Sequence, residues 1–519
     1  MSTDRPTQTA PLASARGGHR GILFAMCLAL VLVVASVSAL NLALPDLAVT
    51  LGADNTALTW IADGYTVALA ALVLPLGAIG DRVGRRSVLI AGCIVFGAAS
   101  ALAATAEAPG ALIAWRVVMG VGAAMIMPGT LSTITAAFPD DQRSRGVATW
   151  SGFAAAGAVL GMLAAGALLE KWGWESIFYA SAGVAALAAV AAALLSPDTK
   201  DADPPRFDVA GSLFTAVGIG TLVFAIIEGS DRGFTSAAVV VTSVVCVIAF
   251  AAYAIHGLRT ANPLLDPHLF GLNGFRAGSV TVVTQFMAIF GFFFVGLQFL
   301  QLILGYSPLV SAVALIPVAA VVLPTSLVTP RLVDKLGLKA VMSTGLLLIA
   351  AALVWVSQLT VDSPYSVFLV GLVVAGLGVG LTGATGTAAI VGSLPSGQQG
   401  VASAINDTTR EVGSALGIAV MGSVFSAHYT DRLPDLSALP ATAAAAVRDS
   451  AAAGLAAADQ LGPAGVALAD AVRRAFVDGL SRAMLTVAVV LVIAALGCLL
   501  RAPGRASPGD DEATATSPR

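Results

Sequence analysis

Charged side chains are scarce in this sequence. Asp, Glu, Lys and Arg make up 11% of its 519 residues, whereas a soluble globular chain carries roughly 25%. Hydrophobic residues make up 57%, and the mean hydropathy is +0.89. A water-soluble fold is therefore excluded, and most of the chain is expected to lie in lipid. The formal net charge of -3 provides no strongly basic surface, so no nucleic-acid partner is expected.

Cysteine and histidine are also rare, with four of each. The cysteines are far apart inside apolar stretches, and the histidines lie in tails, loops or helix ends, so neither set has the spacing of a metal site. A membrane-embedded enzyme would need a nucleophile, a base or a metal cluster that converge on one place, and no such group is evident. The sequence predicts no metal, no cofactor, no enzymatic activity and a monomer.

Long apolar stretches fill the rest of the chain. Fourteen of them are long enough to cross a bilayer as helices, which takes about 20 residues each, and they predict an all-α polytopic membrane protein. Residues 1–20 and 503–519 are polar and are expected to be disordered tails. The alanine-rich residues 428–478 are expected to be a long extracellular loop with helical segments. The spans lie near 21–44, 58–79, 87–106, 110–137, 145–168, 175–195, 207–227, 236–257, 275–303, 309–329, 340–358, 364–392, 400–427 and 480–500.

Basic residues between these spans predict the topology, because short loops rich in Lys and Arg stay in the cytoplasm. With both termini in the cytoplasm, the short outer loops hold only Lys171 and Arg232. The composition, rich in Ala, Gly and Arg, indicates a GC-rich bacterial source and hence the bacterial cytoplasmic membrane. The inner loops and helix ends hold Arg82, Arg85, Arg86, Arg143, Arg145, Lys200, Arg206, Arg259, Arg276, Arg331, Lys335 and Lys339.

Two internal matches predict that the chain is duplicated. The basic turn at residues 80–86 returns at 330–339, with its aspartates Asp81 and Asp334 separated by 253 residues. Residues 139–161 align without a gap to 395–417 at an offset of 256. Both matching pieces begin on an inner loop, so the halves are expected to be parallel six-helix repeats. The predicted bundles are 21–200 and 261–502, with two inserted helices in 201–260.

Few charged residues remain at membrane depth, where each costs at least ~2.5–3.5 kcal/mol on insertion. Asp63 lies early in the second span and is either a carboxyl that loads and releases a proton or an interfacial helix cap. Arg116 cannot lose its proton and needs an acceptor. It either pairs with a nearby carboxylate or anchors helices through backbone carbonyls.

Three more charged residues share one face of the span at 400–427. Asp407 has the i,i+3 and i,i+4 spacings to Arg410 and Glu411 that bring side chains together on a helix. Arg410 can neutralise one carboxylate and leave the other free to titrate. The alternative interpretation is a structural ion pair that holds this helix against its neighbours.

The sequence GDRVGRR after the second span, Arg116 with Gly120, Gly122 and Pro128, and the glycine-rich fifth span resemble the signature motifs of the major facilitator superfamily. The inserted helix pair and the sequence GVASAINDTTREVGSALGIAVMGSV resemble its fourteen-helix drug:proton antiporter branch. The resemblance covers roughly residues 20–500. It implies the major facilitator fold of two six-helix repeats plus two inserted helices.

The resemblance also implies roles for residues. Asp63, Arg116 and Asp407 match positions linked to proton coupling or substrate recognition. Gly152, Gly157 and Gly161 match a helix-packing motif, although Ala158 stands where relatives usually carry proline. The residues that match gating positions of the basic turns are Gly77, Asp81, Arg82, Gly84, Arg85, Arg86 and Asp334; their alternative role is a topology signal and helix cap.

One departure concerns the substrate. Ser36 stands where many multidrug relatives carry an aspartate, which argues against a permanently cationic substrate. Ser36, Asn41 and Gln298 are neutral polar groups that can line a central cavity or form hydrogen bonds between helices. The sequence thus predicts a proton-coupled exporter of small amphiphilic drugs or antibiotics that works by alternating access. The alternatives are a dedicated exporter of one natural product and a membrane protein that transports nothing; nutrient uptake is less expected because the inserted helices resemble the drug branch.

Overall fold

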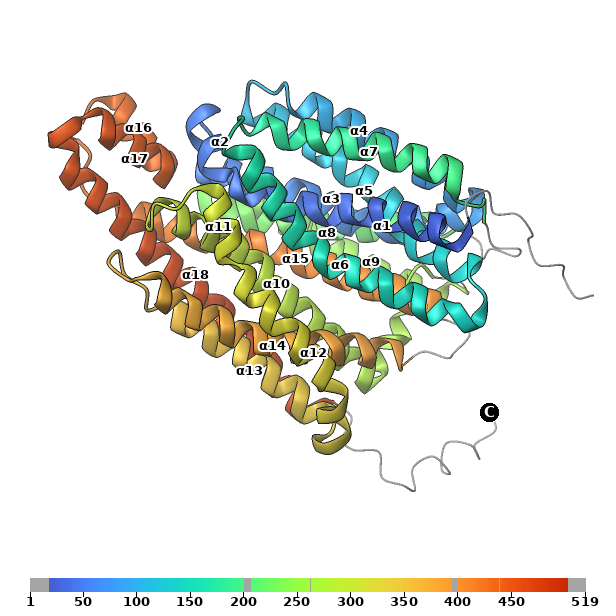
Figure 1. The fold of residues 1–519 in the computed structure, drawn as a ribbon. Coiled ribbons are helices and arrows are strands. Elements are labelled where there is room, and N and C mark those ends of the chain that lie inside the picture. The colour runs from blue at the N-terminus through green and yellow to red at the C-terminus, as the bar shows by residue number, and fades with distance from the viewer. Residues whose placement is uncertain (1–17, 200–206, 262, 394–398, 438, 503–519) are drawn as a thin grey trace, which may run out of the picture.

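The computed structural model describes residues 18–199, 207–261, 263–393, 399–437 and 439–502. For parts of 140–156 and 399–404, and for residues 230, 231 and 501, it describes the backbone alone. The predicted tails fall almost entirely outside these residues. Every regular element in the described residues is a helix, which confirms the predicted all-α class. Figure 1 shows the long helices running side by side as one bundle.

The elements fall into three groups along the chain. The first half contains α1 (Gly18–Ala39), η1 (Leu40–Leu42), α2 (Leu44–Thr50), α3 (Asn55–Val83), α4 (Arg85–Ala103), α5 (Pro109–Ala137), α6 (Asp140–Leu169) and α7 (Glu175–Leu195). The inserted pair is α8 (Val209–Arg232) and α9 (Ala237–Arg259). The second half contains η2 (Pro267–Gly271), α10 (Asn273–Leu302), α11 (Pro308–Ala314), α12 (Ile316–Leu336), α13 (Leu338–Val356), α14 (Tyr365–Val391), α15 (Gln399–Asp431), α16 (Ala441–Asp449), α17 (Ala451–Gln460), η4 (Gly462–Gly465) and α18 (Val466–Arg501).

Thirteen helices in the described residues are long and apolar enough to span a membrane. The remaining predicted span, 145–168, coincides with α6, a continuous helix of 30 residues whose apolar part Gly157–Leu169 is described in full. The span predicted at 309–329 is divided into α11 and α12 at Leu315, because Pro317 begins a new helix. The last span is longer than predicted, since α18 begins at Val466 rather than near residue 480.

The two halves repeat the same packing scheme. In the first half α1 packs on α6 and α7, α4 on α5 and α7, and α3 on α5. In the second half α10 packs on α15 and α18, α13 on α14 and α18, and α12 on α14. Each helix of the first half thus has an equivalent helix in the second half, and the equivalents follow in the same order along the chain. The predicted parallel duplication is therefore present in the three-dimensional structure.

Equivalent turns mark one end of the bundle. Gly84 joins α3 to α4 with φ +128°, and Gly337 joins α12 to α13 with φ +84°. Both values lie in the region that only glycine adopts without strain. A side chain at Gly84 would also collide with Asp198, whose Oδ1 lies 2.7 Å from the place of the added Cβ. We call the end with these two turns the arginine end, and the other the distal end.

The halves meet at the distal end. The Gln301 side chain at the end of α10 donates to the Leu42 carbonyl at 3.1 Å, and Ser307 donates to Glu170. Segment 428–478 contains α16 and α17, and α17 packs on α2 of the first half (Figure 1). These contacts close the distal end in this structure.

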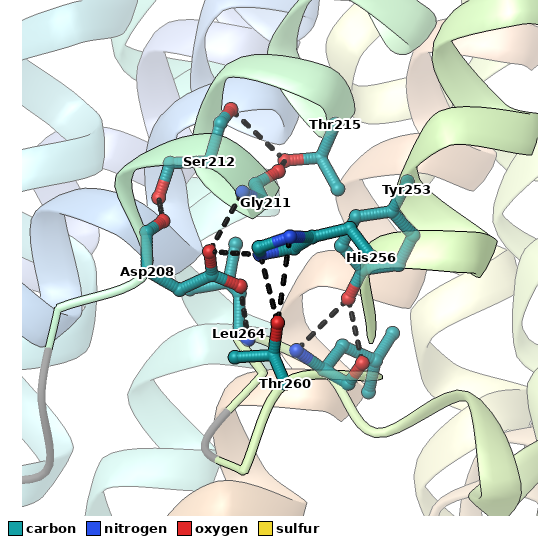
Figure 2. Close-up of polar contacts among 9 residues, drawn as sticks. Asp208, Gly211, Ser212, Thr215, Tyr253, His256, Thr260 and Leu264 are labelled. Atoms are coloured by element: carbon teal, nitrogen blue, oxygen red, sulfur yellow. Dashed lines mark hydrogen bonds and ion pairs between the residues drawn. The ribbon is translucent and has the colours of Figure 1, made fainter. Parts of the chain in front are cut away.

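The inserted helices pack on each other and on the two halves. α8 contacts both α3 of the first half and α15 of the second (Figure 1). At the arginine end a polar cluster ties the pair to the following loop (Figure 2). Asp208 caps α8 through the Gly211 amide at 2.8 Å, and it also accepts from the Leu264 amide at 3.0 Å and contacts His256 Nε2 at 2.7 Å.

The environment of Asp208 favours its anion. Burial alone would raise the pKa of this carboxyl, but the hydrogen bonds from the two amides and from His256 outweigh burial and lower the pKa below its usual range. Tyr253 completes the cluster, because its hydroxyl donates to the Leu265 carbonyl at 2.6 Å and accepts from the Leu265 amide at 2.9 Å. The cluster therefore fixes where the chain leaves the inserted pair and enters the second half.

Candidate functional site

Asp63 lies in α3, a little over two turns from the distal end of that helix, and is completely buried. Its Oδ1 accepts a hydrogen bond from the Thr66 hydroxyl. Its Oδ2 is buried and has no hydrogen-bond partner among the described residues. An unpartnered buried carboxylate oxygen is costly when charged, so the site favours a proton on this oxygen. The helix is instead capped by Asp54, which accepts from the Ala57 amide, so Asp63 is no helix cap.

Arg116 enters the same region from α5 and is 1% exposed. Its Nε donates to the Ile61 carbonyl at 3.0 Å and its Nη2 to the Ala62 carbonyl at 3.2 Å. A longer contact of 3.5 Å reaches the carbonyl of Ser36 in α1. The guanidinium thus binds the backbone of the two residues just before Asp63.

Tyr65 joins this group to α1 of the same half. Its ring lies under Arg116, with 4.6 Å from the guanidinium carbon to the ring centre, and its hydroxyl donates to the Val33 carbonyl at 3.1 Å. The sequence analysis missed Tyr65, although its position two residues after Asp63 and the apolar span around it were visible signals.

The predicted cluster on α15 forms in part. Arg410 Nη1 lies 3.9 Å from Asp407 Oδ1, and its guanidinium carbon lies 4.6 Å from the centre of the Phe286 ring of α10. Asp407 is 5% exposed, whereas Glu411 and Arg410 are half-buried. Helix α15, which packs on α3, therefore carries two carboxyls, and Arg410 lies within 4 Å of one of them, Asp407.

Three of the predicted gating residues at the first basic turn, Asp81, Arg85 and Arg86, contact residues of their own half. Asp81 pairs with Arg85 Nε at 2.7 Å. The Arg85 amide donates to the Thr199 carbonyl at 2.9 Å, and the Arg86 side chain donates to the Ala193 carbonyl. The turn is therefore attached to the end of α7. Of the other predicted gating residues, Gly77 packs against Pro128, Arg82 is half-buried and Asp334 is exposed.

The glycines of α6 face α1. A Cβ added at Gly161 would lie 2.5 Å from the Ala35 Cβ, so only glycine permits this approach. Gly157 is less crowded, with Val31 Cα at 3.5 Å from an added Cβ, and at Gly152 only the backbone is described.

The three neutral polar candidates are buried and bond to their own helices. Ser36 donates to the Leu32 carbonyl at 2.8 Å, Asn41 to Val37 at 3.1 Å and Gln298 to Phe294 at 2.8 Å. Only Asn41 keeps a buried atom, Oδ1, without a partner among the described residues.

A further buried carboxylate escaped the sequence analysis. Glu228 of α8 is 8% exposed, and its Oε1 accepts from Trp60 Nε1 at 2.9 Å, while its Oε2 pairs with Arg232 at 2.6 Å. The predicted span ended at residue 227, one position too early, because helix α8 continues to Arg232. Among the described residues, no group of three or more His, Cys, Asp or Glu side chains could hold a metal ion.

Comparison with known proteins identifies the family of this chain. The family model "Major Facilitator Superfamily" matches residues 26–418. The chain is 31% identical over 475 residues to the multidrug efflux pump LfrA of Mycolicibacterium smegmatis, covering 91% of this chain and 94% of that one. It is 29% identical over 514 residues to the tetracenomycin C resistance and export protein of Streptomyces glaucescens, with 95% of each chain covered.

A solved structure has the same fold. The bacterial homolog of the human lysosomal transporter Spinster, in its inward-facing and unoccupied conformation, aligns with a TM-score of 0.66 over 93% of this chain and 96% of that one, at 17% identity. The relatives and the family model cover most of the chain, including both repeats and the inserted pair. This multi-pass membrane protein belongs to the major facilitator superfamily.

Proposed function

We propose that this chain is a proton-coupled exporter of small amphiphilic drugs or antibiotics that works by alternating access. The observation that carries the proposal is the placement of buried carboxyls on both helices of the seam between the halves. Asp63 is buried on α3, and Asp407 is buried on α15 with the half-buried Glu411 beside it. A proton on one of these groups changes the charge at the surface where the halves must separate.

The relatives support the transported class. Besides the two relatives described above, the methyl viologen resistance protein SmvA of Salmonella typhimurium is 30% identical over 463 residues. We infer that the arginine end faces the bacterial cytoplasm, that both termini lie there and that the protein acts as a monomer in the cytoplasmic membrane. The driving force is the proton gradient rather than a bound cofactor, and nucleic acid is no partner.

In this scheme the structure corresponds to the state closed on the extracellular side. A drug enters from the cytoplasm, and a proton from the outside reaches Asp63 or Asp407 when the distal end opens. Arg116 holds a permanent positive charge on the backbone next to Asp63, so release of the proton leaves a carboxylate beside a cation. Substrate and proton thereby use opposite openings of one molecule.

The test uses purified protein in liposomes with an imposed pH gradient. Cationic, neutral and anionic amphiphiles are added in turn, and a pH-sensitive dye follows proton movement. Proton release on addition of several unrelated compounds is the expected result. Because Ser36 replaces an acidic residue of many relatives, neutral compounds are expected to act at least as well as permanent cations. If no added compound causes proton movement and none is itself transported, the protein is not an exporter of this class.

A dedicated exporter of one natural product is the second candidate. It is favoured by the similarity to the tetracenomycin C resistance and export protein, which extends over 95% of both chains. Release of protons by one compound alone would select this candidate over multidrug export.

A further inference from the structure

We infer that the inserted helix α8 is a strap that holds the distal end of the α3–α15 seam closed, with the Trp60–Glu228 hydrogen bond as its latch. The inference rests on the proposed alternating access and adds a role for the inserted pair. It concerns which contacts must break before the distal end can open.

The apolar face of α8 covers the seam along its length. Ile219 packs with Ala70 and Ala71 of α3 and with Val412 of α15. Farther along, Val223 and Ile227 pack with Ala415 and Ala419 of α15, and with Trp60 and Val67 of α3. These α8 residues recur at helical spacing, so one stripe of α8 contacts both halves at once.

Polar contacts attach the same helix to each half near the distal end. On the side of α3, Trp60 Nε1 donates to Glu228 Oε1 at 2.9 Å. On the side of α15, Ser423 Oγ donates to the Ile226 carbonyl at 2.9 Å. The two attachment points are two residues apart on α8. Separation of α3 from α15 must therefore break one of these bonds or move α8 with one half.

The attachment lies beside a close approach of the two halves. Thr59, the neighbour of Trp60, faces Gly422, the neighbour of Ser423, and a Cβ added at Gly422 would lie 2.7 Å from the Thr59 hydroxyl. Thr59 is 2% exposed. This position is sealed only while the seam is closed, which makes it a reporter for opening.

The bond to α3 is the stronger of the two attachments. Its acceptor is a carboxylate on a residue that is 8% exposed, and hydrogen bonds to charged groups exceed neutral ones in strength. Arg232 balances the charge of Glu228 but is itself half-exposed, so this ion pair contributes little. Trp60 precedes Asp63 by one helical turn, which places the latch directly above the proposed proton site.

The experiment measures the rate at which a membrane-impermeant maleimide labels Thr59→Cys from outside intact cells. The native cysteines Cys27, Cys93, Cys246 and Cys498 are buried, and the unmodified chain provides the background. Trp60→Phe keeps an aromatic ring but removes the donor, and it is expected to raise the labelling rate about tenfold. Glu228→Leu removes the acceptor and is expected to give the same increase.

Matched variants separate the latch from general damage. Glu228→Gln keeps a carbonyl acceptor but loses the charge, so it is expected to raise the labelling rate less than Glu228→Leu does. Arg232→Gln removes only the exposed ion pair and is expected to stay within about twofold of the parent. The double variant Trp60→Phe with Glu228→Leu is expected to label no faster than either single variant, because they remove one shared bond. Ser423→Ala tests the second attachment independently and is expected to raise the rate less.

Unchanged labelling in both Trp60→Phe and Glu228→Leu would overturn the inference. So would an equal increase in Arg232→Gln, or additive effects in the double variant. The assay needs neither a substrate nor a pH gradient, so it reports on the strap even if the liposome experiment finds no drug transport.

Discussion

The guanidinium of Arg116 lies over the face of the buried Tyr65 ring, 4.6 Å from its centre, and is bound there to the backbone that leads to Asp63. The arrangement depends on a close approach of α5 to α3 at Gly120, where an added Cβ would lie 2.4 Å from the Tyr65 carbonyl oxygen. A permanent cation is thereby held beside a titratable carboxyl without forming a direct ion pair with it in the described residues.

Replacement of Arg116 by Lys tests this arrangement. Lysine keeps the charge but cannot donate to the Ile61 and Ala62 carbonyls and lie flat on the ring. We expect a loss of about 2–4 kcal/mol in the free energy of unfolding, from one or two charged hydrogen bonds. Thermal unfolding in detergent measures it. Tyr65→Phe is the control, because it keeps the ring and loses only the bond to Val33; equal stability of Arg116→Lys and the parent would contradict the arrangement.

Substitution of single carboxyls by amides tests proton coupling. Asp63→Asn preserves the shape and the acceptor for Thr66 but carries no titratable proton, so folding is expected to persist while substrate-driven proton release falls to the level of protein-free liposomes. Asp407→Asn and Glu411→Gln, measured in the same assay, determine which α15 carboxyl takes part. Intact coupling in both Asp63→Asn and Asp407→Asn would disprove the proposed coupling residues.

A pair of glycine substitutions on α6 tests the packing on α1. Gly161→Ala places a methyl group 2.5 Å from the Ala35 Cβ, and we expect a cost of about 1–3 kcal/mol from overpacking. Gly157→Ala is the matched control, since its methyl group would meet Val31 at an ordinary contact distance of 3.5 Å. Unfolding temperatures of the two variants are compared, and the prediction is wrong if Gly157→Ala is the more destabilised.

The Asp208 cluster predicts an acid-dependent contribution to stability. Folding lowers the pKa of Asp208, so the stabilisation is complete above the unfolded value of about 3.9 and is lost as the pH falls through the folded value. Asp208→Ala is expected to lose about 1 kcal/mol or more from the missing helix cap. Unfolding is followed from pH 7 to pH 3. The deficit of Asp208→Ala should shrink as the pH falls below about 5; a deficit that keeps growing below that pH would contradict this sign.

Hydropathy and loop chemistry by themselves determined the class of this protein, its spans and its duplication. Lipid provides no hydrogen-bond partners for backbone, so each crossing must be a long apolar helix and is visible along the chain. Gly84 and Gly337 were predictable as equivalent turns because a short polar break between two spans leaves few conformations. The ends of helices were less predictable: α8 continues to Arg232 and α18 begins at Val466, because helical hydrogen bonding does not stop where apolar residues do.

Only the tertiary structure decided which buried charges meet. Arg116 binds carbonyls and Tyr65 rather than forming an ion pair with Asp63, and Asp81 pairs with Arg85 inside its own half. The tertiary structure also places α8 across the α3–α15 seam. There Glu228 accepts a hydrogen bond from Trp60, a residue 168 positions away in the sequence. Such contacts depend on the rotation and the close approach of neighbouring helices. Those are set by packing many side chains together, and no local pattern in the sequence encodes them.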